Sequence, residues 1–183
     1  YMFLHGGLFH ILFNMLALWM FGAELERIWG TRYFLKFYFV TGAGAGLLTV
    51  FFSLLPFAFS QQLFAVPIIG ASGAIFGVMG MYLFYFPYNR VRMIYFLIIF
   101  IGFISVRAVW LLGVWALLEV LYSRMQAAAG VEHGIGHLAH FGGFVAGAIM
   151  AAIYLWSGLV RDDRRHVLAY FFGPSRFVAP YSD

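Results

Sequence analysis

LAHFGGFVAGAIMAAIYLWSG, residues 138–158, is the stretch that decides the fold class of this chain. It contains no Asp, Glu, Lys or Arg, and a helix of ~20 apolar residues is long enough to cross the hydrocarbon core of a bilayer. Comparable apolar runs lie at about 8–23, 33–55, 68–86 and 106–123. The sequence therefore predicts an all-α polytopic membrane protein with five membrane-spanning helices.

The composition of the whole chain fits the same class. Of 183 residues, 64% are hydrophobic, 21% are aromatic and 10% are charged, whereas a soluble domain has ~45–50% apolar and ~25% charged residues. The absence of cysteine excludes a disulfide framework, a thiolate metal site and a cysteine nucleophile. The net charge of +4 does not indicate nucleic-acid binding, because Lys and Arg gather in the cytoplasmic loops of membrane proteins.

One apolar stretch, residues 93–122, is too long for a single span and too short for two spans and a loop. Arg107 interrupts it, and an arginine at the centre of a bilayer is costly. We therefore place the fourth span at about 106–123, with Arg107 near an interface. We expect residues 93–104 to lie shallowly in the membrane or to lead into this helix.

The basic residues predict the orientation of the spans. Nine of the eleven Lys and Arg residues follow the first, third or fifth span: Arg27, Arg32, Lys36, Arg90, Arg92, Arg161, Arg164, Arg165 and Arg176. The positive-inside rule makes this side cytoplasmic, so we expect a cytoplasmic (plasma) membrane and a cytoplasmic tail over 159–183. The chain then starts outside, and a cytoplasmic N-terminus would require a further helix upstream.

Polar side chains gather near the outer ends of the three descending spans. His10 and Asn14 are four residues apart, so they share one helix face. Ser72 lies about one turn into the third span and His140 at the start of the fifth, so the topology brings all four to a similar depth. Because polar groups inside a membrane must have partners or functions, this level is the predicted site.

These residue types fit nucleophilic attack by serine. Ser72 carries the hydroxyl, and His140 carries an imidazole, a side chain that commonly serves as a general base in catalysis. Free backbone N–H groups at the start of a helix, with polar donors from the first span, would stabilise a developing oxyanion. Glu132 falls in an outer loop and the face occupied by Glu119 is undetermined, so we place no carboxylate at this level. The sequence thus favours a Ser–His dyad over a triad.

Each feature also has a purely structural explanation. A serine such as Ser72, in a Gly-rich membrane helix, commonly donates to a backbone carbonyl one turn earlier. His10 and Asn14 could simply join neighbouring helices. Gly143 and Gly147 have the spacing that lets membrane helices pack closely, and this spacing indicates packing alone. Only the joint occurrence of these features favours a catalytic site.

Three sequence motifs together resemble those of the rhomboid family of intramembrane serine proteases. HILFN at 10–14 matches the family's HxxxN motif, GASG at 70–73 its GxSG motif, and AHFGGFVAG at 139–147 its AHxxGxxxG motif. The order of the motifs, the order of the spans and the side of the membrane agree over about 2–158. The resemblance implies a rhomboid-like helical bundle in which the first of six core helices is missing from this chain.

The resemblance also implies roles for individual residues. Ser72 would be the nucleophile and His140 the general base, and an oxyanion hole would be formed by His10, Asn14 and the backbone N–H of Ser72. Residues implied to line or pack the site are Gly70, Gly73, Phe76, Gly143 and Gly147.

Three further positions match less central family features. His5 would help to order the outer loop, and Glu26 would have a structural role at the cytoplasmic end of its helix. Phe76 stands where some members carry a Tyr packed against the catalytic histidine.

The predicted function is therefore that of a serine endopeptidase that hydrolyses transmembrane substrates near the outer membrane boundary. Its expected partners are transmembrane proteins and the lipid bilayer, without nucleic acid, metal or cofactor. One alternative is a catalytically silent rhomboid-like protein that binds membrane clients. Another is a metal or haem site formed by His5, His10, His137 and His140, which would leave Asn14 and Ser72 unexplained.

Overall fold

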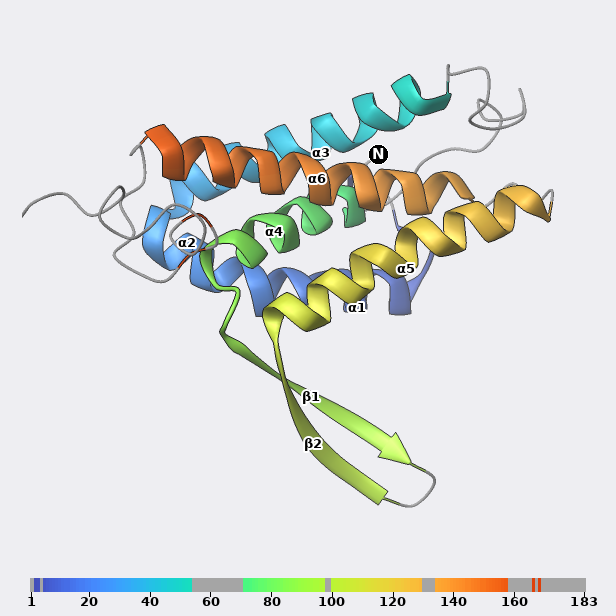
Figure 1. Cartoon of the computed structure of the whole chain (residues 1–183), viewed down its shortest axis with the longest axis horizontal. Coiled ribbons are helices and arrows are strands. Elements are labelled where there is room, and N and C mark those ends of the chain that lie inside the picture. Colours follow the sequence, from blue (N-terminus) through green and yellow to red (C-terminus); the bar gives the residue numbers. More distant parts are fainter. Residues whose placement is uncertain are drawn as a thin grey trace, which may run out of the picture.

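The structure is a computed structural model, which describes residues 2, 3, 5–53, 71–97, 100–129, 134–157, 166 and 168. Its elements follow in chain order: α1 (Leu8–Ala17), η1 (Leu18–Gly22), α2 (Ala23–Trp29), α3 (Thr31–Ser53), α4 (Ser72–Tyr85), β1 (Arg90–Leu97), β2 (Phe100–Arg107), α5 (Ala108–Ala128) and α6 (Gly134–Ser157). The π-helical turn η1 joins α1 and α2 into one continuous helix. The predicted helical membrane bundle is confirmed (Figure 1).

Four helices of the described part are long and apolar enough to span a membrane: Leu8–Trp29, Thr31–Phe51, Ala108–Gln126 and Ala139–Ser157. The fifth, α4, is a shorter apolar helix that begins at Ser72, so the serine opens the helix instead of lying one turn inside it. Residues 68–70 of the predicted span 68–86 lie outside the described part. So do residues 54–55 of the predicted span 33–55, residue 158 of the predicted span 138–158 and most of the tail.

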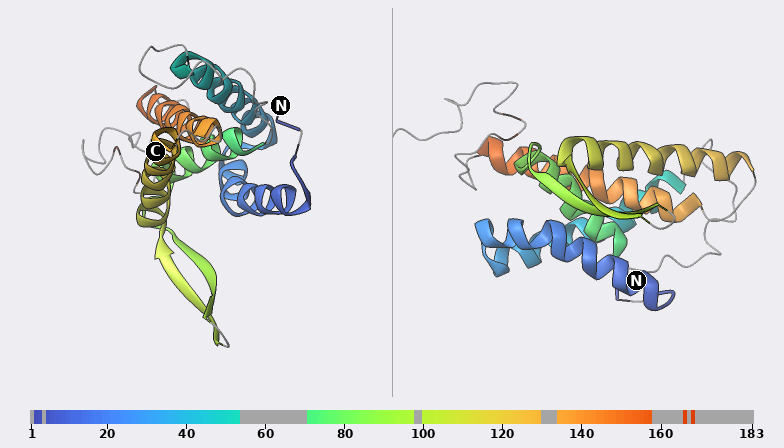
Figure 2. Two further views of the ribbon diagram at one scale, coloured as in Figure 1. Left: turned by 90° about the vertical axis from the view of Figure 1, so that its right-hand side faces the viewer. Right: turned by 90° about the horizontal axis from the view of Figure 1, so that it is seen from below.

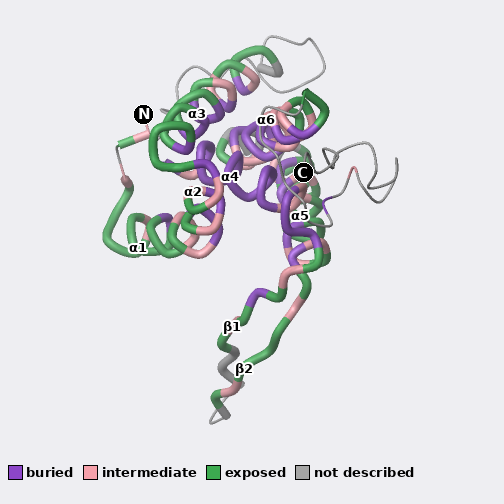
Figure 3. The backbone as a smooth tube through the Cα atoms, turned by 90° about the vertical axis from the view of Figure 1, so that its left-hand side faces the viewer, coloured by how far each residue is buried: buried purple, intermediate pink, exposed green. Residues whose placement is uncertain are grey.

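The short helix α4 forms the centre of the bundle. It packs against α6, α3, η1 and α5, and the long helices surround it in all three views (Figures 1 and 2). Nearly every residue of α4 is buried, whereas the outward faces of α1, α3 and α5 are exposed and apolar (Figure 3). Leu8 and Leu47, for example, are 79% and 72% exposed. An apolar exterior of this kind suits lipid, where backbone groups must be satisfied within helices.

Glycines let α4 and α6 touch backbone to backbone. A Cβ atom on Gly143 would overlap the carbonyl oxygen of Gly73, and one on Gly147 would overlap that of Gly77. A Cβ on Gly80 would meet the α6 backbone in the same way. The small-residue spacing predicted to promote helix packing thus lies where the backbones of α4 and α6 approach each other.

The strands β1 (Arg90–Leu97) and β2 (Phe100–Arg107) pair as an antiparallel β-hairpin, an element that the sequence pattern did not predict. Arg90 pairs with Arg107 at its base, and the strands project away from the helices (Figures 1 and 2). Backbone N–H groups of Ala108 and Val109 donate to the carbonyls of Asn89 and Pro87, at 2.8 and 2.9 Å, and so start α5 directly after β2. The prediction for 93–104 named no secondary structure. The two strands are rich in the β-branched and aromatic residues that favour strands, and β2 leads directly into α5.

The end of α4 opposite Ser72 is tied to its neighbours by side-chain hydrogen bonds. The Tyr82 hydroxyl and the Asn89 amide each donate to Glu24 Oε2 at 3.1 Å. These contacts join α2, α4 and the segment that leads into β1. Nearby, Thr31 donates to Glu26 Oε1 at 2.7 Å across the corner between α2 and α3, where Gly30 has a φ of 77°.

Candidate active site

Ser72 is the first residue of α4, and it stands in the local sequence Gly-Ala-Ser-Gly. The first α-helical hydrogen bond of this turn runs from the Ile75 N–H to the Ala71 carbonyl at 3.0 Å. The N–H groups of Ser72, Gly73 and Ala74 consequently have no acceptor within the helix. The serine therefore lies beside backbone donors that the helix itself leaves unused, at the positive end of a helix dipole.

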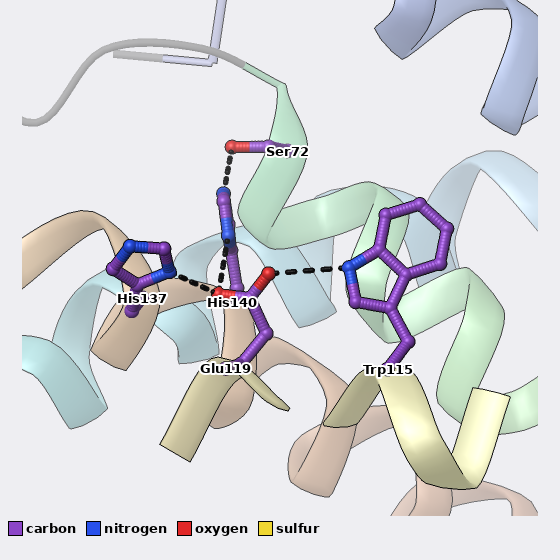
Figure 4. A network of polar contacts seen from close by, with 5 residues as sticks. All are labelled: Ser72, Trp115, Glu119, His137 and His140. Carbon is purple, nitrogen blue, oxygen red and sulfur yellow. Dashed lines mark hydrogen bonds and ion pairs between the residues drawn. The ribbon is translucent and has the colours of Figure 1, made fainter. Parts of the chain in front are cut away.

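The structure brings Ser72 and His140 together from α4 and α6. Their Oγ and Nε2 atoms are 2.7 Å apart, a hydrogen-bond distance (Figure 4). Close approach of the two helices at Gly143 and Gly73 makes this short contact possible. A hydroxyl at this distance from an imidazole can transfer its proton and become a nucleophile.

The ring of Phe76 positions the imidazole from one side. Phe76 is one turn after Ser72 on α4 and stacks on His140, with ring centroids 4.4 Å apart and an interplanar angle of 2°. Phe76 is 5% exposed, so the stack is part of the buried core. An aromatic ring thus packs against this histidine, as the resemblance implied.

A carboxylate contacts the other nitrogen of the imidazole. Glu119 Oε2 lies 3.2 Å from His140 Nδ1 and 2.5 Å from His137 Nδ1, and Trp115 Nε1 donates to Glu119 Oε1 at 3.2 Å (Figure 4). The prediction that no carboxylate reaches this level is wrong. Helix α5 turns Glu119 inward, where the residue is 7% exposed.

His10 and Asn14 lie on α1, apart from this network. Among the described residues, no hydrogen bond or ring contact joins either of them to Ser72. His10 Nδ1 accepts from the Gly6 N–H at 3.1 Å, and its ring meets the edge of His5 at 5.3 Å. Asn14 is buried, and its amide nitrogen has no partner in the described part of the chain.

The remaining predicted site residues are structural in position. Gly73, Gly143 and Gly147 lie at the α4–α6 crossing, and Gly70 lies outside the described residues. Glu26 bridges the corner between α2 and α3.

Glu119, His137 and His140 form the only cluster of potential metal ligands among the described residues, with ligand atoms within 4.8 Å of one another. His5 and His10 do not join it, so the four-histidine site considered from the sequence does not form there. In this structure the three residues are linked by hydrogen bonds.

Sequence reasoning missed Glu119, His137 and Trp115 as parts of this network. A signal was available, because an ionisable residue inside a membrane helix has a functional role by default. The four-residue spacing from Trp115 to Glu119 and the three-residue spacing from His137 to His140 also place each pair on one helix face. Spacing within each helix nevertheless does not tell which face meets the neighbouring helix.

Comparison with known proteins identifies the family of this chain. The family model described as Rhomboid domain matches residues 1–157. The chain is 39% identical over 87 residues to rhomboid protease GluP of Bacillus subtilis, covering 48% of this chain and 15% of GluP. It is 28% identical over 153 residues to RHOMBOID-like protein 1 of Arabidopsis thaliana, and the match covers 83% of this chain and 32% of that protein.

A further relative is rhomboid protease AarA of Providencia stuartii, 25% identical over 170 residues, which cover 84% of this chain and 54% of AarA. The chain thus spans about half or less of the length of these relatives. No solved structure matches it. Because the family model covers most of the chain and four helices are suited to cross a bilayer, this protein is an integral, multi-pass member of the rhomboid family.

Proposed function

We propose that this chain is the core of a serine endopeptidase that cleaves transmembrane protein substrates near the outer boundary of the bilayer. The observation that carries the proposal is the 2.7 Å contact between Ser72 Oγ and His140 Nε2 inside a membrane bundle. Membership in the rhomboid family supports intramembrane proteolysis in general, and the names of GluP and AarA support a protease in particular.

The first chemical step follows from this contact. As the substrate carbonyl approaches Ser72, the Oγ–H proton passes to His140 Nε2 and the oxygen forms a bond to the carbonyl carbon. The carbonyl π-electrons move onto its oxygen, which gives a tetrahedral oxyanion. The proton on His140 then passes to the leaving amide nitrogen, the C–N bond breaks and an acyl-enzyme remains.

Water completes the reaction by the reverse sequence. His140 accepts a proton from water, the resulting hydroxide adds to the acyl carbon, and Ser72 Oγ leaves with the returned proton. Each step uses only the serine, the histidine, the substrate and water. The proposed chemistry therefore balances without a cofactor.

The oxyanion requires donors, and we assign them to Ser72, His10 and Asn14. The Ser72 N–H is free of the helix and lies at the positive end of its dipole. Because His10 Nδ1 accepts from Gly6, the neutral imidazole carries its proton on Nε2 and can donate it. The Asn14 amide is a buried donor without a partner among the described residues, so it is available to a substrate oxygen.

Charge supports the proposed orientation in a cytoplasmic (plasma) membrane. Arg27 and Arg90 lie near the end of the bundle opposite Ser72, close to the Glu24–Tyr82 contact. With these arginines on the cytoplasmic side, Ser72 and His140 open towards the outer side, where the ends of transmembrane substrates emerge.

Fluorophosphonate labelling of the purified full-length protein in detergent tests the proposal, together with cleavage of a reconstituted transmembrane substrate. We expect labelling and cleavage in the natural protein and neither in Ser72→Ala. His140→Ala should also lose both. Ser157→Ala is the matched control, because this serine lies exposed at the end of α6 and, among the described residues, donates to the Tyr154 carbonyl alone.

Residual cleavage in Ser72→Ala would refute the proposal. A folded full-length protein that is neither labelled nor active would also refute it and would favour the client-binding function.

A further inference from the structure

We infer that Glu119 is a positioning residue that completes a Ser72–His140–Glu119 triad; this inference rests on the proposed function. The sequence alone favoured a serine–histidine dyad. The structure places a third side chain, from a third helix, on the imidazole nitrogen that faces away from the serine (Figure 4).

The location of Glu119 already argues for a dedicated role. It lies within the candidate span Ala108–Gln126 and is 7% exposed. A carboxylate buried in a membrane helix is costly unless donors surround it. Its presence among the apolar side chains of residues 108–122 is therefore best explained by the groups that it contacts.

Three donors hold the carboxylate in a single orientation. Trp115, one turn earlier on α5, donates to Oε1 at 3.2 Å, while His137 and His140 lie at hydrogen-bond distance from Oε2. Trp115 also packs its ring edge-to-face against Phe76, with centroids 5.6 Å apart, and Phe76 in turn stacks on His140. The carboxylate, the indole and the imidazole thus form one closed set of contacts between α4, α5 and α6.

The consequence for catalysis concerns the position of the histidine proton. A neutral imidazole carries one proton, on either Nδ1 or Nε2. Because Glu119 accepts at Nδ1, the proton stays there and Nε2 keeps the lone pair that must receive the Ser72 proton. When His140 becomes doubly protonated during the reaction, the adjacent carboxylate also stabilises its positive charge.

The amide variant Glu119→Gln should reverse this proton position. The indole N–H of Trp115 attracts the amide oxygen of the new side chain, so the NH₂ group must face the histidines and donate to His140 Nδ1. The His140 proton then moves to Nε2, where it points at Ser72 and prevents the base from accepting. In Ser–His–Asp enzymes the corresponding acid-to-amide change lowers kcat by about 10⁴-fold.

The test uses the purified full-length protein with a transmembrane substrate and fluorophosphonate. For Glu119→Gln we expect kcat and the labelling rate to fall by at least ~10-fold while KM changes little, because Glu119 is buried and contacts the nitrogen of His140 that does not face Ser72. Nitrogen NMR of labelled histidine should show His140 protonated at Nδ1 in the natural protein and at Nε2 in the variant. Glu26→Gln, the same change at the corner between α2 and α3, is the matched control and should retain activity.

A double variant provides the sharpest test. In Glu119→Gln with Trp115→Phe, the indole no longer fixes the amide, so the Gln oxygen can turn to His140 Nδ1 and part of the lost kcat should return. Phe at 115 keeps an aromatic ring against Phe76. A purely structural role for Glu119 predicts the opposite, a further loss in the double variant.

Three outcomes would overturn the inference while the proposed function stands, provided that Ser72→Ala is inactive. These are wild-type kcat in a folded Glu119→Gln, an unchanged His140 tautomer with a loss of thermal stability alone, and activity that depends on a zinc ion held by Glu119, His137 and His140. Such an ion would take the Nδ1 lone pair of His140, so chelation would remove activity. Activity in Ser72→Ala would instead refute the proposed function itself.

Discussion

Phe76 and His140 lie face to face, with ring centroids 4.4 Å apart and an interplanar angle of only 2°. This stack sets the plane of the imidazole, and Glu119 contacts its Nδ1 within that arrangement. Because Phe76 and Ser72 are four residues apart on α4, the helix that carries the serine also carries the ring that aligns its histidine. Movement of α4 relative to α6 would therefore disturb both contacts together.

Replacing Phe76 should affect activity more than stability alone explains. Phe76→Ala leaves a cavity and removes the stack, and Phe→Ala changes in cores cost about 3–5 kcal/mol. We expect a lower thermal midpoint and a strong loss of kcat. Phe76→Tyr keeps the ring and should retain most activity.

The control for this prediction is Phe21→Ala, because Phe21 is 2% exposed but packs against Tyr82, at the far end of α4. It should lose stability while kcat stays near normal. Equal kcat in Phe76→Ala and Phe21→Ala, measured on the same transmembrane substrate, would show that the stack does not serve catalysis.

The α4–α6 crossing predicts a severe effect of a single methyl group. In Gly143→Ala the new Cβ overlaps the backbone oxygen of Gly73, so the helices must separate and the Ser72–His140 contact lengthens. We expect a destabilisation of about 2 kcal/mol or more and loss of fluorophosphonate labelling. Gly113→Ala on α5 is the control, because its Cβ would meet no described residue within 4 Å apart from the neighbouring backbone of its own helix. Normal labelling of Gly143→Ala would contradict this packing argument.

The polar contacts at the far end of α4 should contribute to stability without affecting the chemistry. Tyr82→Phe removes the hydroxyl that donates to Glu24. Tyr82 itself is ten residues, or about 15 Å along α4, from Ser72. We expect a loss of about 1–2 kcal/mol in unfolding free energy, seen as a lower thermal midpoint. The rate of substrate cleavage below that midpoint should not change. A large fall in kcat would indicate coupling along α4 instead.

Asn14 should show the opposite pattern. Its amide nitrogen is buried without a partner among the described residues, so Asn14→Ala removes no hydrogen bond that this nitrogen donates within that part of the chain. As a donor to the oxyanion, however, its loss should lower kcat by about 10²–10³-fold. Asn89→Ala, which removes the amide bonded to Glu24, is the control and should reduce stability more than kcat. Full activity in Asn14→Ala would remove it from the oxyanion hole.

Composition and motif spacing predicted much of this protein without its structure. An apolar run such as 138–158 has few options except a membrane helix, because backbone groups in lipid must bond within their own segment. The membrane class, the helical bundle and the rhomboid family follow from such runs and from the three motifs, and all are confirmed. Ser72 and His140 were also paired in advance, and the structure places them in hydrogen-bond contact.

The hairpin and the Glu119 network were decided only by the tertiary structure. Residues 93–104 are apolar almost throughout, and a short apolar run without periodicity does not distinguish a strand from a helix. Helix α5 is likewise apolar around most of its circumference, so no amphipathic stripe indicates which face turns inward. The rotation of α5 about its own axis, relative to α4 and α6, places Glu119 against His140. This rotation is set by side-chain packing between helices, so the spacing of residues within α5 could not predict it.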